Sequence, residues 1–307
     1  MTILQARNLR KSFASTTALQ DLNLDIQSGS FFGLLGPNGA GKSTFMSIVS
    51  GFLVQDSGKL TLEGQALVPS DIAQKKKIGL SPQHIALYKE LSAESNLKLF
   101  GKIYGLSGKV LSQQIEYALE VAQLSDRRKS AVKEFSGGMK RRLNIATALM
   151  HKPKILLCDE PTVGVDPQSR NAIFDTLLDL KGEGMTVVYS THYMEEAERL
   201  CDQIGIIDAG KILRTGTLDT LLQELPRTNI IRARAASLDE SNQAGFRQFG
   251  EVEPDGSSLQ LKTQADFKLS HFFRWTEEQG LDASDFQIAR PSLEDLFLHL
   301  TGKDLRE

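Results

Sequence analysis

The feature that most constrains the fold is a glycine-rich run at residues 36–44, Gly-Pro-Asn-Gly-Ala-Gly-Lys-Ser-Thr, which fits the pattern G-x-x-x-x-G-K-[ST] in full. Glycines lack a Cβ atom, so the backbone can turn tightly and point its N–H groups at phosphate oxygens. Lys42 supplies a positive charge for the phosphates, and Ser43 supplies a hydroxyl for Mg²⁺. An apolar run precedes this loop at residues 31–35 and a helix-like segment follows it at residues 44–49. The sequence therefore predicts a buried strand, a phosphate-binding loop and a helix whose N-terminus favours anions.

A second feature is an apolar strand beginning at Lys154 that ends in two carboxylates, Asp159 and Glu160. Asp159, at the carboxyl end of the strand, is placed to hold Mg²⁺ through its water shell. Glu160 follows it and can orient and deprotonate a water molecule. Together with the phosphate-binding loop upstream, this strand end predicts phosphate chemistry.

A third run, Ser136-Gly137-Gly138, opens a predicted helix shortly before the acidic strand. These small residues also suit contacts between backbone N–H groups and phosphate, although such a run alone is typical of a linker or turn. Between a phosphate-binding loop and an acidic strand end it is the signature sequence of the ATP-binding cassette (ABC) family. The chain resembles the nucleotide-binding subunit of an ABC transporter, and the resemblance implies that ATP and Mg²⁺ are bound.

The remaining motifs of that family are found in the family's order over residues 1–220. Gln83 matches the glutamine that contacts Mg²⁺ and water where the cassette meets the membrane subunit. Asp166 matches a loop that reaches across a dimer interface, and His192 matches the switch histidine at the γ-phosphate. Phe13 matches the aromatic residue that stacks on adenine.

The resemblance implies a complete set of site residues. Four residues are expected to be catalytic, namely Lys42, Gln83, Glu160 and His192. ATP is expected to contact Phe13, Gly36, Asn38, Gly39, Gly41, Lys42, Ser43, Thr44, Ser136, Gly137, Gly138 and Asp166. Mg²⁺ is expected near Ser43, Gln83 and Asp159.

Two positions depart from the family pattern. Met139 stands where the signature usually has a glutamine, but Ser136 and Gly138, which make the phosphate contacts, are intact. We therefore expect ATP turnover to survive this change. At Phe13 the family more often has a tyrosine, and phenylalanine should stack on adenine equally well.

The composition is that of an ordinary globular protein, with 40% hydrophobic and 24% charged residues. The net charge of −2 gives no general attraction to nucleic acid or to anionic membranes. No apolar run approaches the ~20 residues that span a bilayer, and the N-terminus lacks the apolar core of a signal peptide. With only Cys158 and Cys201 we expect no disulfide. The expected location is the cytoplasmic face of the cell membrane, bound to a membrane subunit.

The segment pattern predicts two domains, 1–225 and 226–307, with the boundary marked by Pro226. The first is an α/β P-loop NTPase cassette, with a β-rich lobe of short strands over residues 1–27 and a parallel sheet flanked by helices. By resemblance, its helical subdomain at about residues 88–150 carries the signature and faces the membrane subunit. The exposed Tyr88 is a candidate for that interface.

The second domain is predicted to have the order β-α-β-β-α-β, which fits a small α+β ferredoxin-like accessory domain. The predicted elements are a strand at 229–235, a helix at 238–249, a hairpin at 251–261, a helix at 265–279 and a strand at 286–289.

A terminal helix is predicted to start at Pro291 and Ser292 and to stop at Gly302. Its apolar residues fall at i, i+3, i+4 and i+7 from Leu293 and form one stripe. We expect this stripe to dock on the accessory domain or on a second copy rather than on a membrane. The ending Ser-Leu-Glu-Asp-Leu-Phe resembles ABC exporters with a separate six-helix permease, a class that includes many drug and antibiotic exporters.

The resemblance implies an ATPase subunit that powers export of a drug, antibiotic or lipid-like cargo. Two copies, or this chain and a paralogous cassette, form a head-to-tail dimer with two ATP molecules between them. Each ATP contacts residues 36–44 of one copy and residues 136–138 of the other. The partners are integral membrane permease subunits, and no nucleic-acid partner is expected.

Two alternative functions remain open at this point. An importer subunit shares every catalytic motif found here. A soluble ABC ATPase acting on ribosomes or DNA is less well supported, because such proteins usually have two cassettes, a coiled-coil insertion or zinc-binding cysteines.

Overall fold

The computed structural model describes residues 1–68, 70–225, 230–235, 238–263, 267–289 and 291–302. These residues form two compact units, Met1–Thr217 and a second that begins at Leu218. Pro226, where the sequence places the domain boundary, lies outside the described residues. The division at 225 and 226 stays a prediction; α8 (Leu218–Leu222) contacts α11 (Leu293–Thr301) and belongs to the second unit.

The core of the first unit is a six-stranded sheet with the order β10-β9-β3-β8-β7-β6. Its strands are β3 (Phe31–Leu35), β6 (Ile78–Ser81), β7 (Ile155–Asp159), β8 (Thr186–Thr191), β9 (Gln203–Asp208) and β10 (Lys211–Gly216). All neighbours are parallel except β10, which is antiparallel to β9. Leu35 is paired with Thr191, and Asp159 with Ser190. The carboxyl ends of β3, β7 and β8 therefore meet at one edge, where the loops after them form the site.

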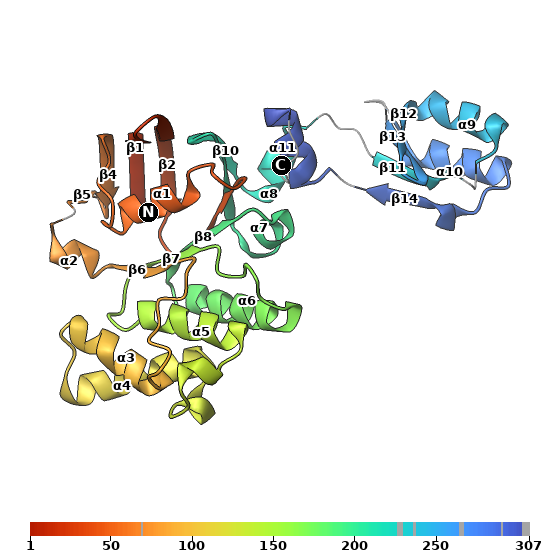
Figure 1. Cartoon of the computed structure of the whole chain (residues 1–307). Helices are drawn as coiled ribbons and strands as arrows, with labels where there is room; N and C mark the ends of the chain where they lie inside the picture. Colours follow the sequence, from red (N-terminus) through yellow and green to blue (C-terminus); the bar gives the residue numbers. More distant parts are fainter. Residues whose placement is uncertain (69, 226–229, 236–237, 264–266, 290, 303–307) are drawn as a thin grey trace. The chain divides into compact units, whose positions relative to one another are not determined.

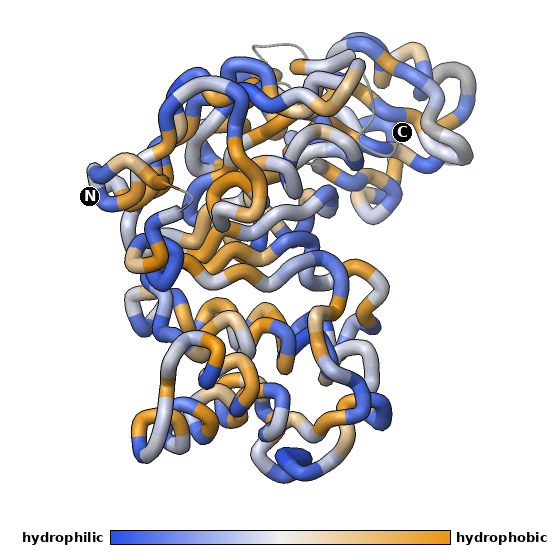
Figure 2. Tube along the Cα trace, turned by 60° about the vertical axis from the view of Figure 1, so that its left-hand side comes forward, coloured by the Kyte–Doolittle hydropathy of each residue, from blue (hydrophilic) through white to orange (hydrophobic). Residues whose placement is uncertain are grey.

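Helices cover both faces of this sheet. Because successive side chains of a strand point to opposite faces, neighbouring strand residues pack into two different cores. Leu157 and Val188 join a core cluster with residues of α1 (Lys42–Val49). Cys158 and Tyr189, their neighbours along the chain, join a second cluster with α5 (Gly137–Ala148) and α6 (Pro167–Gly182). Figure 1 shows α1 on one side of the sheet and α5 and α6 on the other. Figure 2 shows apolar residues concentrated along these central strands.

A second sheet, antiparallel and four-stranded, has the order β2-β1-β4-β5. It contains β1 (Thr2–Phe13), β2 (Thr16–Gln27), β4 (Ser57–Leu62) and β5 (Gln65–Ala66). The predicted lobe of short strands over residues 1–27 is thus corrected to two 12-residue strands. Ala14, with φ 47°, makes the turn between them.

The helical region has a core of its own, formed by α3 (Ala93–Ile103), α4 (Gly108–Val121) and α5. Short helical segments complete the unit: α2 (Ile72–Lys75), η1 (Ser125–Arg127), η2 (Val132–Glu134) and α7 (Met194–Leu200). Tyr88 is 56% exposed, as expected for an interface candidate.

The second unit contains the predicted β-α-β-β-α-β order. Its elements are β11 (Ile230–Arg234), α9 (Glu240–Phe246), η4 (Arg247–Phe249), β12 (Gly250–Asp255), β13 (Ser258–Thr263), α10 (Leu269–Glu278), η5 (Ala283–Asp285) and β14 (Phe286–Ala289). The sheet is antiparallel with the order β12-β13-β11-β14. This agrees with the predicted ferredoxin-like arrangement, although residue 229 and residues 265–266 of the predicted elements lie outside the described ranges.

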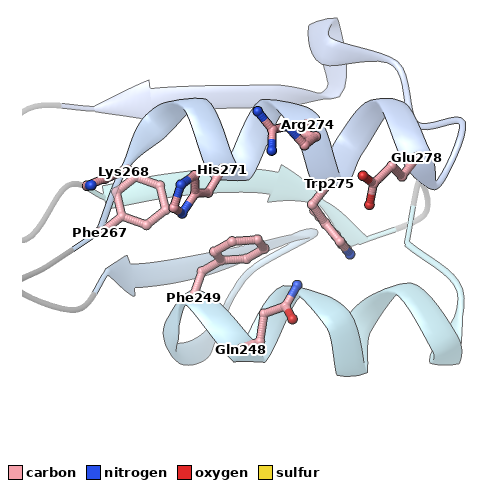
Figure 3. A pocket seen from close by; sticks show the side chains of 8 residues that line it. All are labelled: Gln248, Phe249, Phe267, Lys268, His271, Arg274, Trp275 and Glu278. Carbon is pink, nitrogen blue, oxygen red and sulfur yellow. The ribbon is translucent and has the colours of Figure 1, made fainter.

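Aromatic residues fill the core of this unit, including Phe246, Phe272 and Phe286. The ring centroids of Phe272 and Phe286 are 5.2 Å apart in an edge-on contact. A cavity of about 540 Å³ lies between α10 and η4. Figure 3 shows Phe249 and Trp275 projecting into the space between these two elements. None of the residues that line this cavity belongs to the sequence motifs.

The terminal helix α11 is formed as predicted. Ser292 and Asp295 make a capping box, in which each side chain accepts a hydrogen bond from the other residue's backbone N–H. Gly302, with φ 68°, ends the helix in the left-handed conformation. The apolar stripe is buried at Leu293, Leu296 and Phe297. Among the described residues, no helix has the length and apolar character needed to cross a bilayer.

Candidate active site

The glycine-rich loop joins β3 to α1 and has room for no side chain at two of its glycines. A Cβ atom at Gly36 would lie 2.1 Å from the carbonyl oxygen of Ile207. Gly41, just before α1, has φ 108°, and a Cβ atom there would lie 2.6 Å from the carbonyl oxygen of Ala18. The N–H of Gly36 donates to the carbonyl of Thr191 at 3.3 Å, which ties the loop to the end of β8. The loop is therefore held in a fixed conformation by its surroundings.

The side chain of Lys42 points back toward the loop that precedes it. Its side chain is only 4% exposed, and its Nζ donates to the carbonyls of Gly36 at 2.7 Å and Pro37 at 2.9 Å. Nζ also lies 3.1 Å from Oε1 of Glu160. Burial lowers the pKa of Lys42, while the Glu160 carboxylate acts in the opposite direction. The ammonium is thus held in the centre of the loop by oxygen atoms.

A cavity of about 520 Å³ opens beside the loop. Nine of its lining residues belong to the predicted site: Asn38, Gly39, Gly41, Lys42, Ser43, Thr44, Gln83, Glu160 and His192. The remaining lining residues, which the sequence did not identify, are Ala18, Val163 and Tyr193.

The four predicted catalytic residues meet at the carboxylate of Glu160. Oε2 of Glu160 accepts a hydrogen bond from Nε2 of Gln83 at 3.0 Å. Oε1 lies 3.1 Å from Nζ of Lys42 and 3.4 Å from Nδ1 of His192. These residues come from four separate segments of the chain, and the sheet edge brings them together.

A serine that the motifs did not identify holds the two carboxylate residues in place. Oγ of Ser190 donates to Oδ1 of Asp159 at 2.6 Å and accepts from the backbone N–H of Glu160 at 2.9 Å. Glu160 has φ 44°, in the left-handed region that few non-glycine residues adopt. The register of β7 against β8 places Ser190 opposite Asp159, and only that register could have revealed it.

The signature residues 136–138 and Asp166 do not line this cavity. Ser136 caps α5, and its Oγ accepts from the N–H of Met139 at 3.2 Å. Asp166 caps α6 by accepting from the N–H of Ser169 at 2.9 Å. A Cβ atom at Gly138 would lie 2.2 Å from Oγ of Ser169, so the starts of α5 and α6 are in contact. The two motifs lie side by side.

Phe13 is also outside the cavity lining. It ends β1 with 44% of its surface exposed, and Nζ of Lys11 lies 5.5 Å from the centre of its ring. An exposed ring is free to stack on a planar group.

Met139 is half-buried and packs against the core of the helical region.

The known proteins that this chain resembles are ATP-binding proteins, and the family that it matches is that of ABC transporters. The family model described as "ABC transporter" matches residues 19–163. The chain is 42% identical to the linearmycin resistance ATP-binding protein LnrL of Bacillus subtilis (strain 168), an alignment that covers 99% of this chain and 100% of that protein. It is 36% identical to the daunorubicin resistance ATP-binding protein DrrA3 of Streptomyces coeruleorubidus, over 99% and 98% of the two chains. It is 35% identical to the Nod factor export ATP-binding protein I of Cupriavidus pinatubonensis (strain JMP 134 / LMG 1197), over 99% and 92%.

Solved structures of ABC cassettes have the same fold. The structure of cbiO1 from Clostridium perfringens, part of the ABC transporter complex cbiONQ, has a TM-score of 0.67 and 26% identity, over 73% of this chain and 91% of that one. A dimeric post-hydrolysis structure of the ATP-binding cassette MJ0796 with ADP and Pi has a TM-score of 0.64 and 27% identity, over 70% and 99%. The predicted cassette fold is confirmed. The chain belongs to the ABC transporter family and is an ATP-binding subunit that hydrolyses ATP for transport.

Proposed function

We propose that the chain is the ATPase subunit of an exporter for a drug, antibiotic or lipid-like cargo, bound to a separate permease at the cytoplasmic face of the membrane. The support is its likeness, over almost its whole length, to relatives named for linearmycin resistance, daunorubicin resistance and Nod factor export. Each of these likenesses includes the second unit as well as the cassette, and none of these names describes import.

The observation that carries the catalytic part of the proposal is the meeting of Lys42, Gln83 and His192 at the Glu160 carboxylate beside the glycine-rich loop. In this assignment, loop N–H groups and Lys42 bind the β- and γ-phosphates. Glu160 accepts a proton from the attacking water, and Gln83 helps to orient that water. His192 stabilises the charge that develops on the γ-phosphate.

Lys42 has the contacts that a phosphate-binding ammonium needs. Its Nζ lies 3.1 Å from the Glu160 carboxylate and donates to two loop carbonyls. The γ-phosphate of a triphosphate in this loop is a stronger anionic partner for the same ammonium. An ammonium paired with phosphate would leave the Glu160 carboxylate free to accept a proton from water.

The donor set fits Mg²⁺, which prefers oxygen ligands and keeps several of its waters. Ser43, in the first turn of α1, and Gln83 both line the cavity. Asp159 ends β7, and Ser190 donates a hydrogen bond to its carboxylate. Among the described residues there is no cluster of three or more His, Cys, Asp or Glu side chains that would form an all-protein metal cage. A Mg²⁺ ion carried in by nucleotide needs only one or two protein oxygens, and when bound it neutralises phosphate charge.

We also propose that the site is completed by a second copy or a paralogous cassette in a head-to-tail dimer. Ser136, Gly138 and Asp166 lie beside one another but do not line the cavity that contains Lys42. Small residues at a helix N-terminus suit contacts with phosphate, so these residues are available to nucleotide bound on another chain. Solved structures of a related cassette are dimeric, which supports the pairing of two cassettes.

The proposed function is tested by affinity purification of the chain from detergent-solubilised membranes of the cells that make it, followed by mass spectrometry. We expect a polytopic membrane protein in a stoichiometric amount, and a mock purification from cells without the tagged chain should lack it. Recovery only from the soluble fraction, with ribosomal or DNA-bound partners, would contradict the exporter assignment while leaving the ATPase chemistry intact.

A further inference from the structure

A buried carboxylate outside the cavity lining connects two of the site's loops. Glu196, in α7, has 3% of its side chain exposed. Its Oε1 accepts a hydrogen bond from Oγ1 of Thr162 at 2.8 Å. Its Oε2 accepts from the hydroxyl of Tyr189 at 2.8 Å and from Oγ1 of Thr191 at 2.7 Å. One side chain thus binds hydroxyl groups from three positions in two segments.

A buried carboxylate is tolerated only when hydrogen bonds replace its lost hydration. Here the three hydroxyls supply them. Nε of Arg170 approaches Oε1 only to 3.8 Å, which is too long for a hydrogen bond, and its guanidinium lies over the ring of Tyr193. Burial raises the pKa of the Tyr189 phenol, and the Glu196 charge raises it further, so Tyr189 remains a donor. All three hydroxyls therefore donate to Glu196, and Oγ1 of Thr162 also lies 3.1 Å from the hydroxyl of Tyr189.

The two threonines that donate to Glu196 each lie within two residues of a proposed catalytic residue. Thr162 follows Glu160 by two residues, and Thr191 immediately precedes His192. Oγ1 of Thr191 also accepts from the N–H of Tyr193 at 2.9 Å, which fixes the backbone on the far side of His192. The carboxylate thus ties the chain after the base to the chain around the switch histidine.

The backbone at Glu160 needs such support, because a non-glycine residue held in the left-handed region stores strain. Ser190 holds the N–H of Glu160 on one side. On the other side, Thr162 holds the chain through Glu196. The carbonyl of Thr191 also accepts from the N–H of Gly36, so the same anchor reaches the phosphate-binding loop.

We propose that Glu196 is a positioning residue for hydrolysis, whose carboxylate sets the distance and orientation of Glu160 relative to His192. The inference rests on the roles proposed above for those two residues. A general base misplaced by about 1 Å loses on the order of 10²-fold in rate, because the transferred proton and the attacking water must be aligned. Glu196 does not touch the cavity, so nucleotide binding does not depend on it directly.

The test compares Glu196→Gln with Glu195→Gln, the exposed neighbouring carboxylate on the same helix. Turnover is divided by the amount of ATP bound at saturation, measured by calorimetry, so that unfolded chains are not counted. For Glu196→Gln we expect kcat to fall about 10- to 100-fold with KM and ATP affinity unchanged. Glu195→Gln should match wild type. A merely structural role would lower the bound fraction and the melting temperature but not kcat per bound ATP.

The hydroxyl partner supplies a second test, and its comparison of single Thr162 variants does not require the Glu196 variant to fold. Thr162→Ser keeps the donor and should retain wild-type kcat, whereas Thr162→Val removes it and should lower kcat with KM unchanged. Because both changes break the same hydrogen bond, the effects of Thr162→Val and Glu196→Gln should be strongly non-additive. If Thr162→Val matches wild type, or if its effect simply adds to that of Glu196→Gln, the inference is wrong.

Glu160→Gln separates the failure of this inference from failure of the proposed function. If Glu160→Gln abolishes turnover while Glu196→Gln keeps normal kcat per bound ATP, Glu196 has no positioning role and the proposed function stands. If Glu160→Gln turns over ATP normally, the assignment of the base fails, and the inference about Glu196 fails with it.

Discussion

The residue that organises the site is Glu160, because its carboxylate meets Lys42, Gln83 and His192. Lys42 and Glu160 are only 4% and 7% exposed, so their attraction is poorly screened by water. Each of these charges is buried with the other as its partner. Removal of either one therefore changes the electrostatics of the whole cavity.

At the residue scale, we predict that Lys42→Ala abolishes tight ATP binding. Loss of one partner from a desolvated, hydrogen-bonded charge pair typically costs about 2–5 kcal/mol, or roughly 30- to several thousand-fold in Kd. Titration calorimetry with ATP checks this, and Lys76→Ala, at an exposed lysine, is the control. An unchanged ATP affinity in Lys42→Ala would refute the assignment of Lys42.

The sequence could predict some of these residues and not others. Lys42 and Glu160 lie in motifs whose spacing along the chain carries their chemistry, and the structure places both in the cavity. Ser190 and Glu196 could not be predicted in this way. Their partners Asp159 and Thr162 become neighbours only through the pairing of β7 with β8 and the packing of α7, which no local pattern specifies.

At the scale of the element, the sequence predicts a segment well where short-range features, such as the residues at a helix end, define its boundaries. The start of α11 at Ser292 and its end at Gly302 are set by short-range features, and both are as predicted. The sequence predicts short strands where β1 and β2 are each 12 residues long. Asn8 and Asp21 have positive φ angles of 48° and 53°, and the ladder between the strands has register shifts. Such irregularities interrupt the alternating pattern while the pairing continues.

The turn after α5 contains a titratable group that links the helix to the sheet. Nε2 of His151 lies 2.9 Å from the carbonyl oxygen of Ile78 in β6, and the ring stacks on Tyr104 with centroids 3.8 Å apart. Its Nδ1 is buried and, within the described part of the chain, has no hydrogen-bond partner. Burial lowers the pKa of His151 more than the hydrogen bond to the Ile78 carbonyl raises it, and the charge of Lys76 lowers it further.

We predict that this histidine makes the cassette less stable in mild acid. Its folded pKa lies below the unfolded value of about 6.5, so the unfolded chain binds the proton more readily. The stabilisation is present above that value and is lost as pH falls toward the folded pKa. The melting temperature of wild type should therefore fall more between about pH 7.5 and pH 5 than that of His151→Gln. The exposed His271→Gln should behave as wild type, and identical pH curves for wild type and His151→Gln would contradict the prediction.

At the scale of the whole molecule, the residues of the proposed nucleotide site lie in two separate places on one chain. The cavity beside the glycine-rich loop contains the proposed base, whereas Ser136, Gly138 and Asp166 lie outside its lining. The sequence could predict this division only through the family resemblance, because nothing in the residues of one chain specifies which surface meets a second copy.

We predict that ATPase activity per chain rises with chain concentration and then levels off. At high dilution most chains are monomers whose bound nucleotide lacks the signature residues of a partner. A dilution series of the purified chain at saturating ATP and Mg²⁺, with the oligomeric state followed by light scattering, checks this. Constant activity per chain across the transition from dimer to monomer would exclude a shared site.

The role of Glu160 as the base of an ATPase site is tested most directly by the ATP turnover and ATP affinity of Glu160→Gln, measured beside wild type under the same conditions. The amide cannot accept the proton of the attacking water, while Lys42 and the loop remain able to bind phosphate. We predict that ATP binding is kept and that turnover falls by about 10²–10⁴-fold, the usual share of a general base. Near-normal hydrolysis by Glu160→Gln would contradict it.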